Sequence, residues 1–131
     1  MEFEDRDRHL IHDLLARWCW LMDAGNAEEW VLLWTDDGTF TGIPETAKGP
    51  EQLGQIPVQF HEMGGGKFRH SMSNITLEPG ANADEAVAHA YSTLTDWSQG
   101  GALIGFAQVC FDLVRRDRGW KIRAQHAEAI G

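Results

Sequence analysis

The sequence is short of cysteine, of basic residues and of long hydrophobic runs, and each shortage excludes a class of protein. Only two cysteines, Cys19 and Cys110, occur in 131 residues. They lie far apart in apolar surroundings, so buried free thiols are expected rather than a disulfide framework. The 11 Lys and Arg residues against 20 Asp and Glu give a net charge of −9. This balance argues against binding to nucleic acid or to an anionic membrane surface.

Targeting signals and several familiar catalytic motifs are also missing. No stretch approaches the roughly 18 apolar residues of a membrane helix, and the charged start MEFEDRDRHL lacks the apolar core of a signal peptide. We therefore expect a cytoplasmic protein. HEMGG, from His61, has no second His to complete a zinc motif, MGGGK lacks the spacing of a phosphate-binding loop, and no G-x-S-x-G elbow occurs. We expect neither a metal nor another cofactor.

The first half of the chain has the pattern of three helices. Residues 4–22 carry apolar side chains at spacings of three and four, which predicts an amphipathic helix that ends before Gly25. Asn26 and Glu29 resemble a capping box for a second helix, on which we place Trp30, Leu33 and Trp34. A short strand is expected at 39–41. A third helix follows from 49 to about 63, and Pro57 should kink or restart it.

From Lys67 onward the pattern changes to strands separated by turns. Four strands are expected, at about 67–78, 86–97, 102–116 and 120–130, with turns at EPGANADE, SQGG and DRG. Helices followed by an antiparallel meander predict an α+β fold in a single domain, 1–131. Three helices that cover one face of a strongly curved, mostly antiparallel sheet would leave a cone-shaped half-barrel with one open end.

Asp23 and His70 are the first candidates for chemistry. Asp23 continues the apolar stripe of the first helix, where a carboxylate also opposes the helix dipole, so it is a candidate acid or base. The alternative is a solvated aspartate at a fraying helix end. In KFRHSMSNITLE, strand alternation places His70, Met72 and Asn74 on one face. An isolated strand histidine is more often structural than catalytic, but an amide and a carboxylate nearby change that expectation.

Three further polar residues lie in the predicted strands. Asp96 closes YSTLTDW, where an apolar residue would be less costly to bury. His126 alternates with Trp120 and Ile122 and so faces inward, or else lies beyond the core at the end of the strand. Gln108 lies on the third strand, facing in a direction that depends on bulges which the sequence does not mark.

The order of these elements resembles a known family. WLMDAGNAEEWVLLWTDDGTF, FRHSMSNITLE and RGWKIRAQ, in this order over nearly the whole chain, are similar to the SnoaL-like branch of the nuclear transport factor 2-like, or cystatin-like, superfamily. The resemblance implies an apolar pocket inside the cone and a homodimer. It also implies an acid–base site in which Asp23 partners His70, with Asp96 as a further catalytic group, and a substrate-binding amide at Asn74 or Gln108.

The resemblance is strongest to the scytalone and bile-acid dehydratase type, with one departure. Those enzymes use tyrosines near the helix aspartate, whereas this chain has Trp18, Trp20 and Met22 there, and its one tyrosine is Tyr91. This argues against the scytalone reaction itself. We expect a cofactor-independent lyase or isomerase acting on a small, cyclic, largely apolar hydroxy-ketone, with Trp18 and Met72 shaping its pocket.

Two other functions remain open at this point. The same fold hosts non-catalytic binding domains and accessory subunits, for which an acid–base pair has no use. An epoxide hydrolase of the limonene type would need an Asp–Arg–Asp set. Asp23, Arg69 and Asp96 supply these residue types, but in places that differ from those of that family.

Overall fold

The computed structural model describes residues 3–42 and 46–130. The elements are α1 (Asp5–Asp23), α2 (Ala27–Val31), β1 (Trp34–Thr41), β2 (Ala47–Lys48), α3 (Gly49–Gly64), β3 (Phe68–Pro79), β4 (Glu85–Asp96), a 3-10 turn η1 (Trp97–Gln99), β5 (Ala102–Arg116) and β6 (Gly119–Ala129). The order of helices followed by long strands confirms the predicted α+β class.

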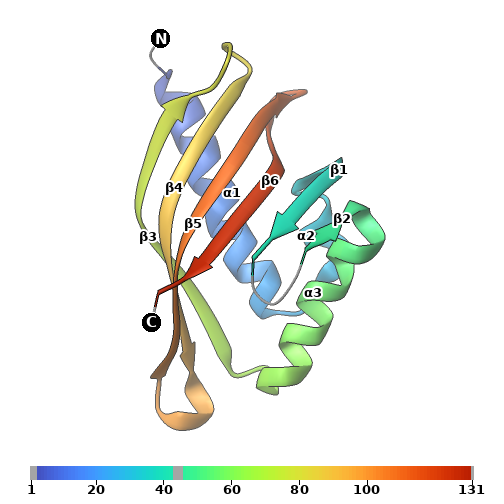
Figure 1. Cartoon of the computed structure of the whole chain (residues 1–131), viewed down its shortest axis with the longest axis vertical. Helices are drawn as coiled ribbons and strands as arrows, with labels where there is room; N and C mark the ends of the chain where they lie inside the picture. Colours follow the sequence, from blue (N-terminus) through green and yellow to red (C-terminus); the bar gives the residue numbers. More distant parts are fainter. Residues whose placement is uncertain (1–2, 43–45, 131) are drawn as a thin grey trace.

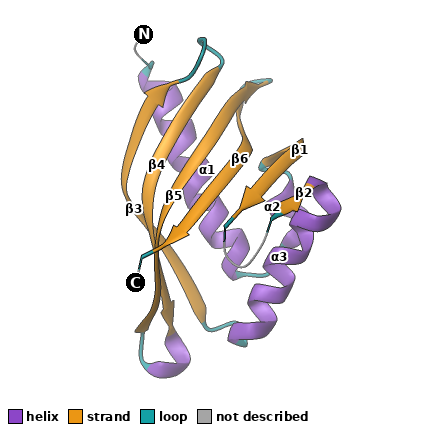
Figure 2. Ribbon diagram, viewed as in Figure 1, coloured by secondary structure: helices purple, strands orange, loops and turns teal. Residues whose placement is uncertain are grey.

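The strands form one curved, unclosed sheet in the order β2-β1-β6-β5-β4-β3. β3 to β6 are an antiparallel meander, and β1 joins it by a parallel pairing with β6. Figures 1 and 2 show α1 lying across one face of this sheet, with α3 beside β1 and β2. The helices therefore cover one face, and the opposite face carries no helix in the part of the chain that the structure describes.

Helix α1 supplies much of the core, as its periodicity predicts. Its buried face includes Ile11, Leu15, Trp18 and Met22, which pack against the inner face of the sheet. The helix ends at a left-handed Gly25, where a Cβ atom would come within 2.8 Å of the His61 side chain. Glycine is needed here both for its positive φ and for the close approach of α3.

The second helix is shorter than predicted. The Asn26 side chain caps it by accepting from Glu29 N–H, as expected, but the helix ends at Val31. Trp34 is wrongly placed on it: this residue begins β1, buried and in contact with Trp30 at a ring separation of 5.2 Å. A short apolar run such as WVLLW is compatible with the helical period of 3.6 residues and with the strand period of two. Tertiary packing therefore decides where the helix ends and the strand begins.

Helix α3 runs without interruption through Pro57, so the helix is not restarted there. Proline removes one helical hydrogen bond and crowds the preceding turn. Here Pro57 lies one turn after Leu53, and both are buried. The apolar contacts of this face hold the helix together across the proline.

Three one-residue register shifts occur in the antiparallel meander, and two of these β-bulges decide which side chains face the helices near the candidate site. In β3 the register shifts between Ser73 and Thr76, and Asn74 adopts a left-handed φ of 56°. In β6 Asp112 pairs with Ala124 and Leu113 with Ile122, so that Arg123 is the additional residue. Each bulge inverts the alternation beyond it, because the side-chain period of a strand is two residues.

Side-chain size falls along the inner face of the sheet. At one end β5 and β6 present large, fully buried residues such as Phe111, Leu113 and Ile122. Toward the other end the inward positions of β5 are Val109, Ala107 and Gly105, and those of β6 end in Ala127 and Ala129. The small residues at these inward positions leave room for a cavity.

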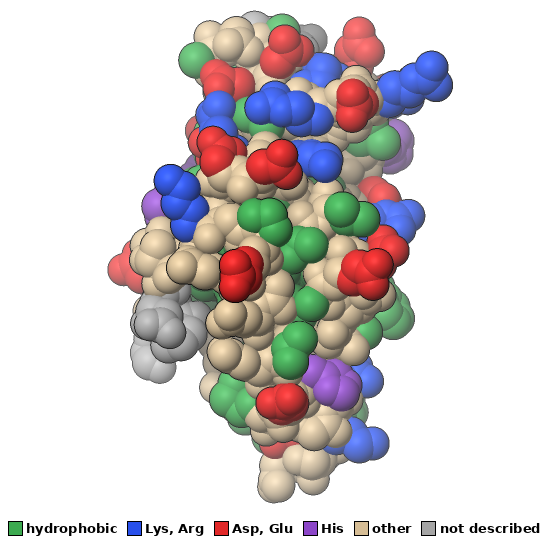
Figure 3. All heavy atoms as spheres, turned by 90° about the vertical axis from the view of Figure 1, so that its right-hand side faces the viewer, with side chains coloured by type: hydrophobic (Ala, Val, Ile, Leu, Met, Phe, Trp, Pro, Cys, Tyr) green, Lys and Arg blue, Asp and Glu red, His purple; other side chains and the backbone are tan. Residues whose placement is uncertain are grey.

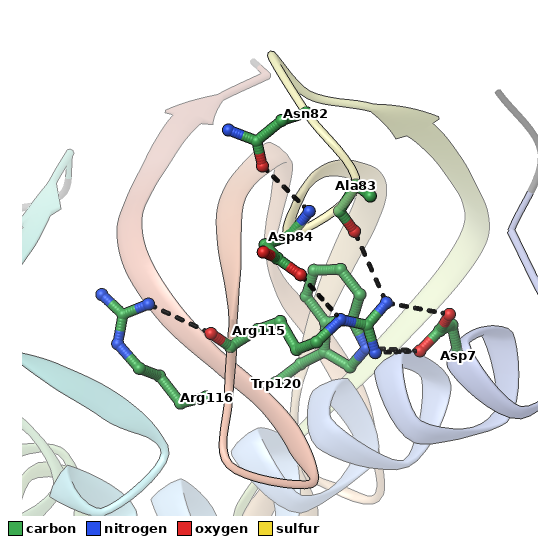
Figure 4. Close-up of polar contacts among 7 residues, drawn as sticks. All are labelled: Asp7, Asn82, Ala83, Asp84, Arg115, Arg116 and Trp120. Atoms are coloured by element: carbon green, nitrogen blue, oxygen red, sulfur yellow. Dashed lines mark hydrogen bonds and ion pairs between the residues drawn. The ribbon is translucent and has the colours of Figure 1, made fainter.

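An ion-pair cluster fixes the start of α1 on the sheet (Figure 4). Arg115 of β5 donates to both carboxylate oxygens of the buried Asp7, at 2.7 and 3.1 Å, and also to Asp84. Its guanidinium lies 4.6 Å from the Trp120 ring centroid, and the Trp120 indole donates to Asp7. These hydrogen bonds hold the pKa of the Asp7 carboxyl below its usual value.

Candidate active site

The structure brings Asp23 and His70 together. Asp23 is the last residue of α1, and His70 is the third residue of β3. One carboxylate oxygen lies 2.8 Å from the ring Nδ1 of His70, and the other accepts the His70 main-chain N–H, also at 2.8 Å. The side chains are only 9% and 12% exposed, respectively. A carboxylate held by two hydrogen bonds has one orientation, and so does the ring beside it.

This contact fixes the tautomer of a neutral His70. An ionised carboxylate only accepts hydrogen bonds, so Nδ1 must carry the hydrogen and Nε2 keeps its lone pair. Aromatic contacts hold the ring in place as well: the Trp18 indole meets it edge-on at 5.1 Å between centroids, and the Phe60 ring lies at 4.7 Å. A neutral His70 ring therefore has a fixed orientation, with its free nitrogen at Nε2.

His70 lines a cavity of about 1060 Å³ between the sheet and α3, at the upper end of the usual range for small-molecule sites. Most of its lining is apolar or small. The other residues that line it are Trp18, Phe40, Thr46, Ala47, Glu51, Gln52, Gln55, Ile56, Gln59, Phe60, Met63, Ser92, Leu94, Ile104, Gly105, Phe106, Ala107, Val109, Gln125, Ala127 and Ala129. Figure 3 views the molecule from the side on which α3 lies in Figure 1, and hydrophobic side chains gather near the middle of that face.

Gln125 is a cavity residue that the sequence did not reveal. It is 1% exposed, and its Oε1 accepts the Trp18 indole N–H at 2.8 Å. Strict alternation from Trp120 would have turned His126 inward, but the bulge at Arg123 turns Gln125 inward and leaves His126 exposed. Nothing in the local sequence marks that bulge, so no sequence signal could have found the residue.

Asn74 and Gln108 lie away from this cavity. The predicted common face of His70, Met72 and Asn74 ends at Met72, because the bulge turns Asn74 to the outer face. There Asn74 and Gln108 line a smaller pocket of about 260 Å³, together with His89 and Tyr91. The structure therefore separates the two expected substrate-binding amides from the Asp23–His70 pair.

Asp96 and Met72 do not line the cavity either. The Asp96 carboxylate caps the η1 turn by accepting the N–H and the hydroxyl of Ser98, at 2.9 and 2.6 Å. Met72 is half-buried and packs against the core. Of the expected site residues, Asp23, His70 and Trp18 come together, whereas Asp96, Asn74, Gln108 and Met72 do not join them.

The thiol nearest to the site is not reactive. Burial raises the pKa of Cys19 to about 12, and the negative charge of Asp23 adds to this effect. Burial also raises the pKa of Cys110, and both cysteines are free, as expected.

Among residues 3–42 and 46–130, no three His, Cys, Asp or Glu side chains lie together as a metal site would require. Over the same ranges no helix is both long and apolar enough to cross a membrane.

The fold and this site define the class of protein. A curved mixed sheet with helices on one face around a cavity is the cystatin-like, or nuclear transport factor 2-like, fold. The sequence matches the SnoaL-like domain over residues 4–126, and the protein belongs to this family. The family resemblance predicted from the order of sequence motifs is confirmed.

Several solved structures share the fold. A protein of unknown function with a cystatin-like fold from Nostoc punctiforme is 26% identical, with a TM-score of 0.84 over 99% of this chain and 96% of that one. A nuclear transport factor 2-like protein from Novosphingobium aromaticivorans is 25% identical, with a TM-score of 0.84 over 95% of this chain and 82% of that one. No curated protein sequence matches significantly.

A scytalone-dehydratase-like protein from Novosphingobium aromaticivorans also has a similar structure. Its TM-score is 0.77 at 16% identity, over 95% of this chain and 84% of that one. At this identity the likeness shows the fold alone.

Proposed function

We propose that this protein is an acid–base catalyst, a lyase or isomerase that acts on a small, cyclic, largely apolar carbonyl compound. The observation that carries the proposal is the Asp23–His70 pair, buried beside a large apolar cavity. A non-catalytic binding domain needs the cavity, but it has no need of a histidine whose tautomer is fixed by a carboxylate.

The chemical step follows from the tautomer. His70 Nε2 takes a proton from the carbon next to the substrate carbonyl, and the C–H electron pair forms an enolate. Asp23 stabilises the resulting imidazolium, as the carboxylate does in other base–orienter pairs. The imidazolium then returns the proton to a hydroxyl on the next carbon, which leaves as water and completes a dehydration. Return of the proton to another carbon would give isomerisation. Both routes move only protons and electron pairs within the substrate, so neither requires a cofactor.

The first half of this step can be tested without the natural substrate. In D₂O, a base that removes an α-proton exchanges it for deuterium, and the loss of the ¹H signal of 2-tetralone reports the rate. We expect the protein to accelerate the exchange. The substitution His70→Gln should lower the rate of protein-catalysed exchange roughly 10²–10⁴-fold. His61→Gln, at an exposed position of α3, is the matched control and should keep the full rate.

Binding must be measured beside the exchange rate. Quenching of tryptophan fluorescence, to which Trp18 in the cavity wall should contribute, reports whether 2-tetralone is bound. If the ketone binds and its protons exchange equally fast with the protein and with His70→Gln, the catalytic proposal is wrong and a binding domain is the better account. If the ketone does not bind at all, the proposed substrate class is wrong.

A further inference from the structure

Gln125 is a buried amide whose NH₂ group makes no hydrogen bond in the described part of the chain. Its side chain is 1% exposed and lines the cavity. The Trp18 indole N–H can only donate, so the atom of the amide that faces it must be the oxygen, Oε1. The orientation of the amide is thereby fixed, and its NH₂ group points away from Trp18.

The NH₂ group has no acceptor in the described part of the chain. None of the side-chain hydrogen bonds there involves Gln125 Nε2. The nitrogen is also not sealed inside the protein: over the same residues, the sealed side-chain polar atoms without a partner are Nε1 of Trp30 and Nε1 of Trp34. Nε2 therefore opens on the cavity, and a buried donor of this kind is satisfied only when a ligand or water supplies an oxygen.

One side chain links this donor to the base. The Trp18 indole donates to Gln125 at 2.8 Å and meets the His70 ring edge-on at 5.1 Å. Trp18 thus contacts both Gln125 and His70, and all three residues line one cavity. A ligand that contacts both needs a hydrogen-bond acceptor and, a short distance away, an acidic hydrogen.

We infer that Gln125 donates to the carbonyl oxygen of the substrate and that Trp18 positions it to do so. This deepens the proposed function and rests on it for the chemical step. As His70 removes the α-proton, the C–H electrons form the C=C bond and the carbonyl π electrons move to the oxygen. The negative charge therefore develops on the atom that Gln125 faces, where a preorganised donor stabilises it.

The inference is tested by comparing two probes of nearly the same shape. 2-Tetralone has a carbonyl oxygen, and tetralin is the corresponding hydrocarbon. We expect the protein to bind the ketone more tightly than the hydrocarbon, and Gln125→Met to reduce this preference about tenfold while tetralin binding stays unchanged. Gln99→Met, which removes an exposed amide outside the cavity, is the matched control and should keep the preference.

Gln125→Met removes the acceptor of the buried Trp18 indole and could therefore impair folding. A second variant keeps this acceptor. Gln125→Glu keeps an oxygen for Trp18 and presents another oxygen to the ligand, so it should also bind the ketone less tightly than the wild type does. With ¹³C-labelled ketone, the carbonyl resonance should lie further downfield in the wild-type complex than in either variant, as expected for an oxygen that accepts a hydrogen bond. An unchanged preference and an unchanged carbonyl shift in both variants would overturn the inference.

The two proposals fail in different ways. If His70→Gln exchanges protons as fast as the wild type but keeps the preference for the ketone, the catalytic proposal fails and the assignment of Gln125 stands. If Gln125→Glu exchanges protons at the wild-type rate with an unchanged preference, the assignment of Gln125 fails and the catalytic proposal stands.

Discussion

Asp23 accepts two hydrogen bonds from a single residue, His70, one from its main-chain N–H and one from its ring, each 2.8 Å long. The two residues are 47 positions apart in the chain. The carboxylate therefore ties the end of α1 to the start of β3, and it also orients a ring that faces the cavity. Because one group serves both purposes, substitutions at Asp23 must be chosen to separate folding from chemistry.

Asp23→Asn should change the tautomer of His70. The asparagine amide can donate to Nδ1, which would move the ring hydrogen to Nε2 and remove the lone pair from the cavity. ¹⁵N NMR distinguishes the tautomers: in the wild type we expect Nδ1 to be protonated, and in the variant Nε2. Protonated Nε2 in the wild-type neutral ring would contradict the proposed base.

Asp7 should make stability depend on pH. Hydrogen bonds from Arg115 lower the pKa of the folded carboxyl below its ordinary value of 3.8. The contribution is therefore present above about pH 4 and is lost as the pH falls through the folded pKa. Urea unfolding should show that Asp7→Asn costs roughly 1.5–3 kcal/mol at pH 7, and less at about pH 3.

Asp13→Asn is the matched control for this measurement. Asp13 pairs with Arg17 on the exposed side of α1, where such pairs contribute only about 0.2–1 kcal/mol. An Asp7→Asn effect that is equally large at both pH values would show that the ion pair is not its cause.

Ala107→Phe should fill the cavity and spare the fold. Ala107 is one of the small inward residues that leave room for the cavity. The added ring should weaken 2-tetralone binding tenfold or more, while the far-UV circular dichroism spectrum stays unchanged. Glu128→Phe adds the same ring at an exposed position of the neighbouring strand and should not affect binding. Equal effects of the two variants would place the ligand elsewhere.

Asn74 should contribute to stability through its left-handed backbone conformation. Glycine adopts a φ of 56° without strain, whereas a β-branched residue is strained there. Asn74→Gly should therefore unfold at nearly the wild-type urea concentration, and Asn74→Val should lose about 1–2 kcal/mol. If Asn74→Gly folds normally but no longer binds the ketone, Asn74 has the substrate-binding role that the sequence suggested.

The sequence predicts more of the fold than of the site. Long periodic segments, such as α1 with Ile11 and Leu15, have one interpretation, and the order of motifs identifies the family. The Asp23–His70 pair was also predictable, because a carboxylate on an apolar stripe and a histidine in a strand are both unusual. The expected homodimer stays a prediction.

The parts of the site that the sequence did not predict have one main physical cause. A bulge of one residue inverts every side chain beyond it, and the sequence marks neither the bulge at Asn74 nor the one at Arg123. The first removes Asn74 from the cavity, and the second turns Gln125 inward and His126 outward, a direction that the sequence had left open. Trp34 was misplaced for another reason, since a short apolar run fits a helix and a strand equally well.

The central claim is that Asp23 and His70 act as one unit, and a double-mutant comparison of α-proton exchange tests it most directly. We measure the protein-catalysed exchange of 2-tetralone with Asp23→Asn, with His70→Gln and with both substitutions. Our account predicts that the exchange rate of each single variant is roughly 10²–10⁴-fold below that of the wild type. The double variant should exchange no more slowly than His70→Gln. Single effects that multiply in the double variant, or a fully active Asp23→Asn, would contradict it.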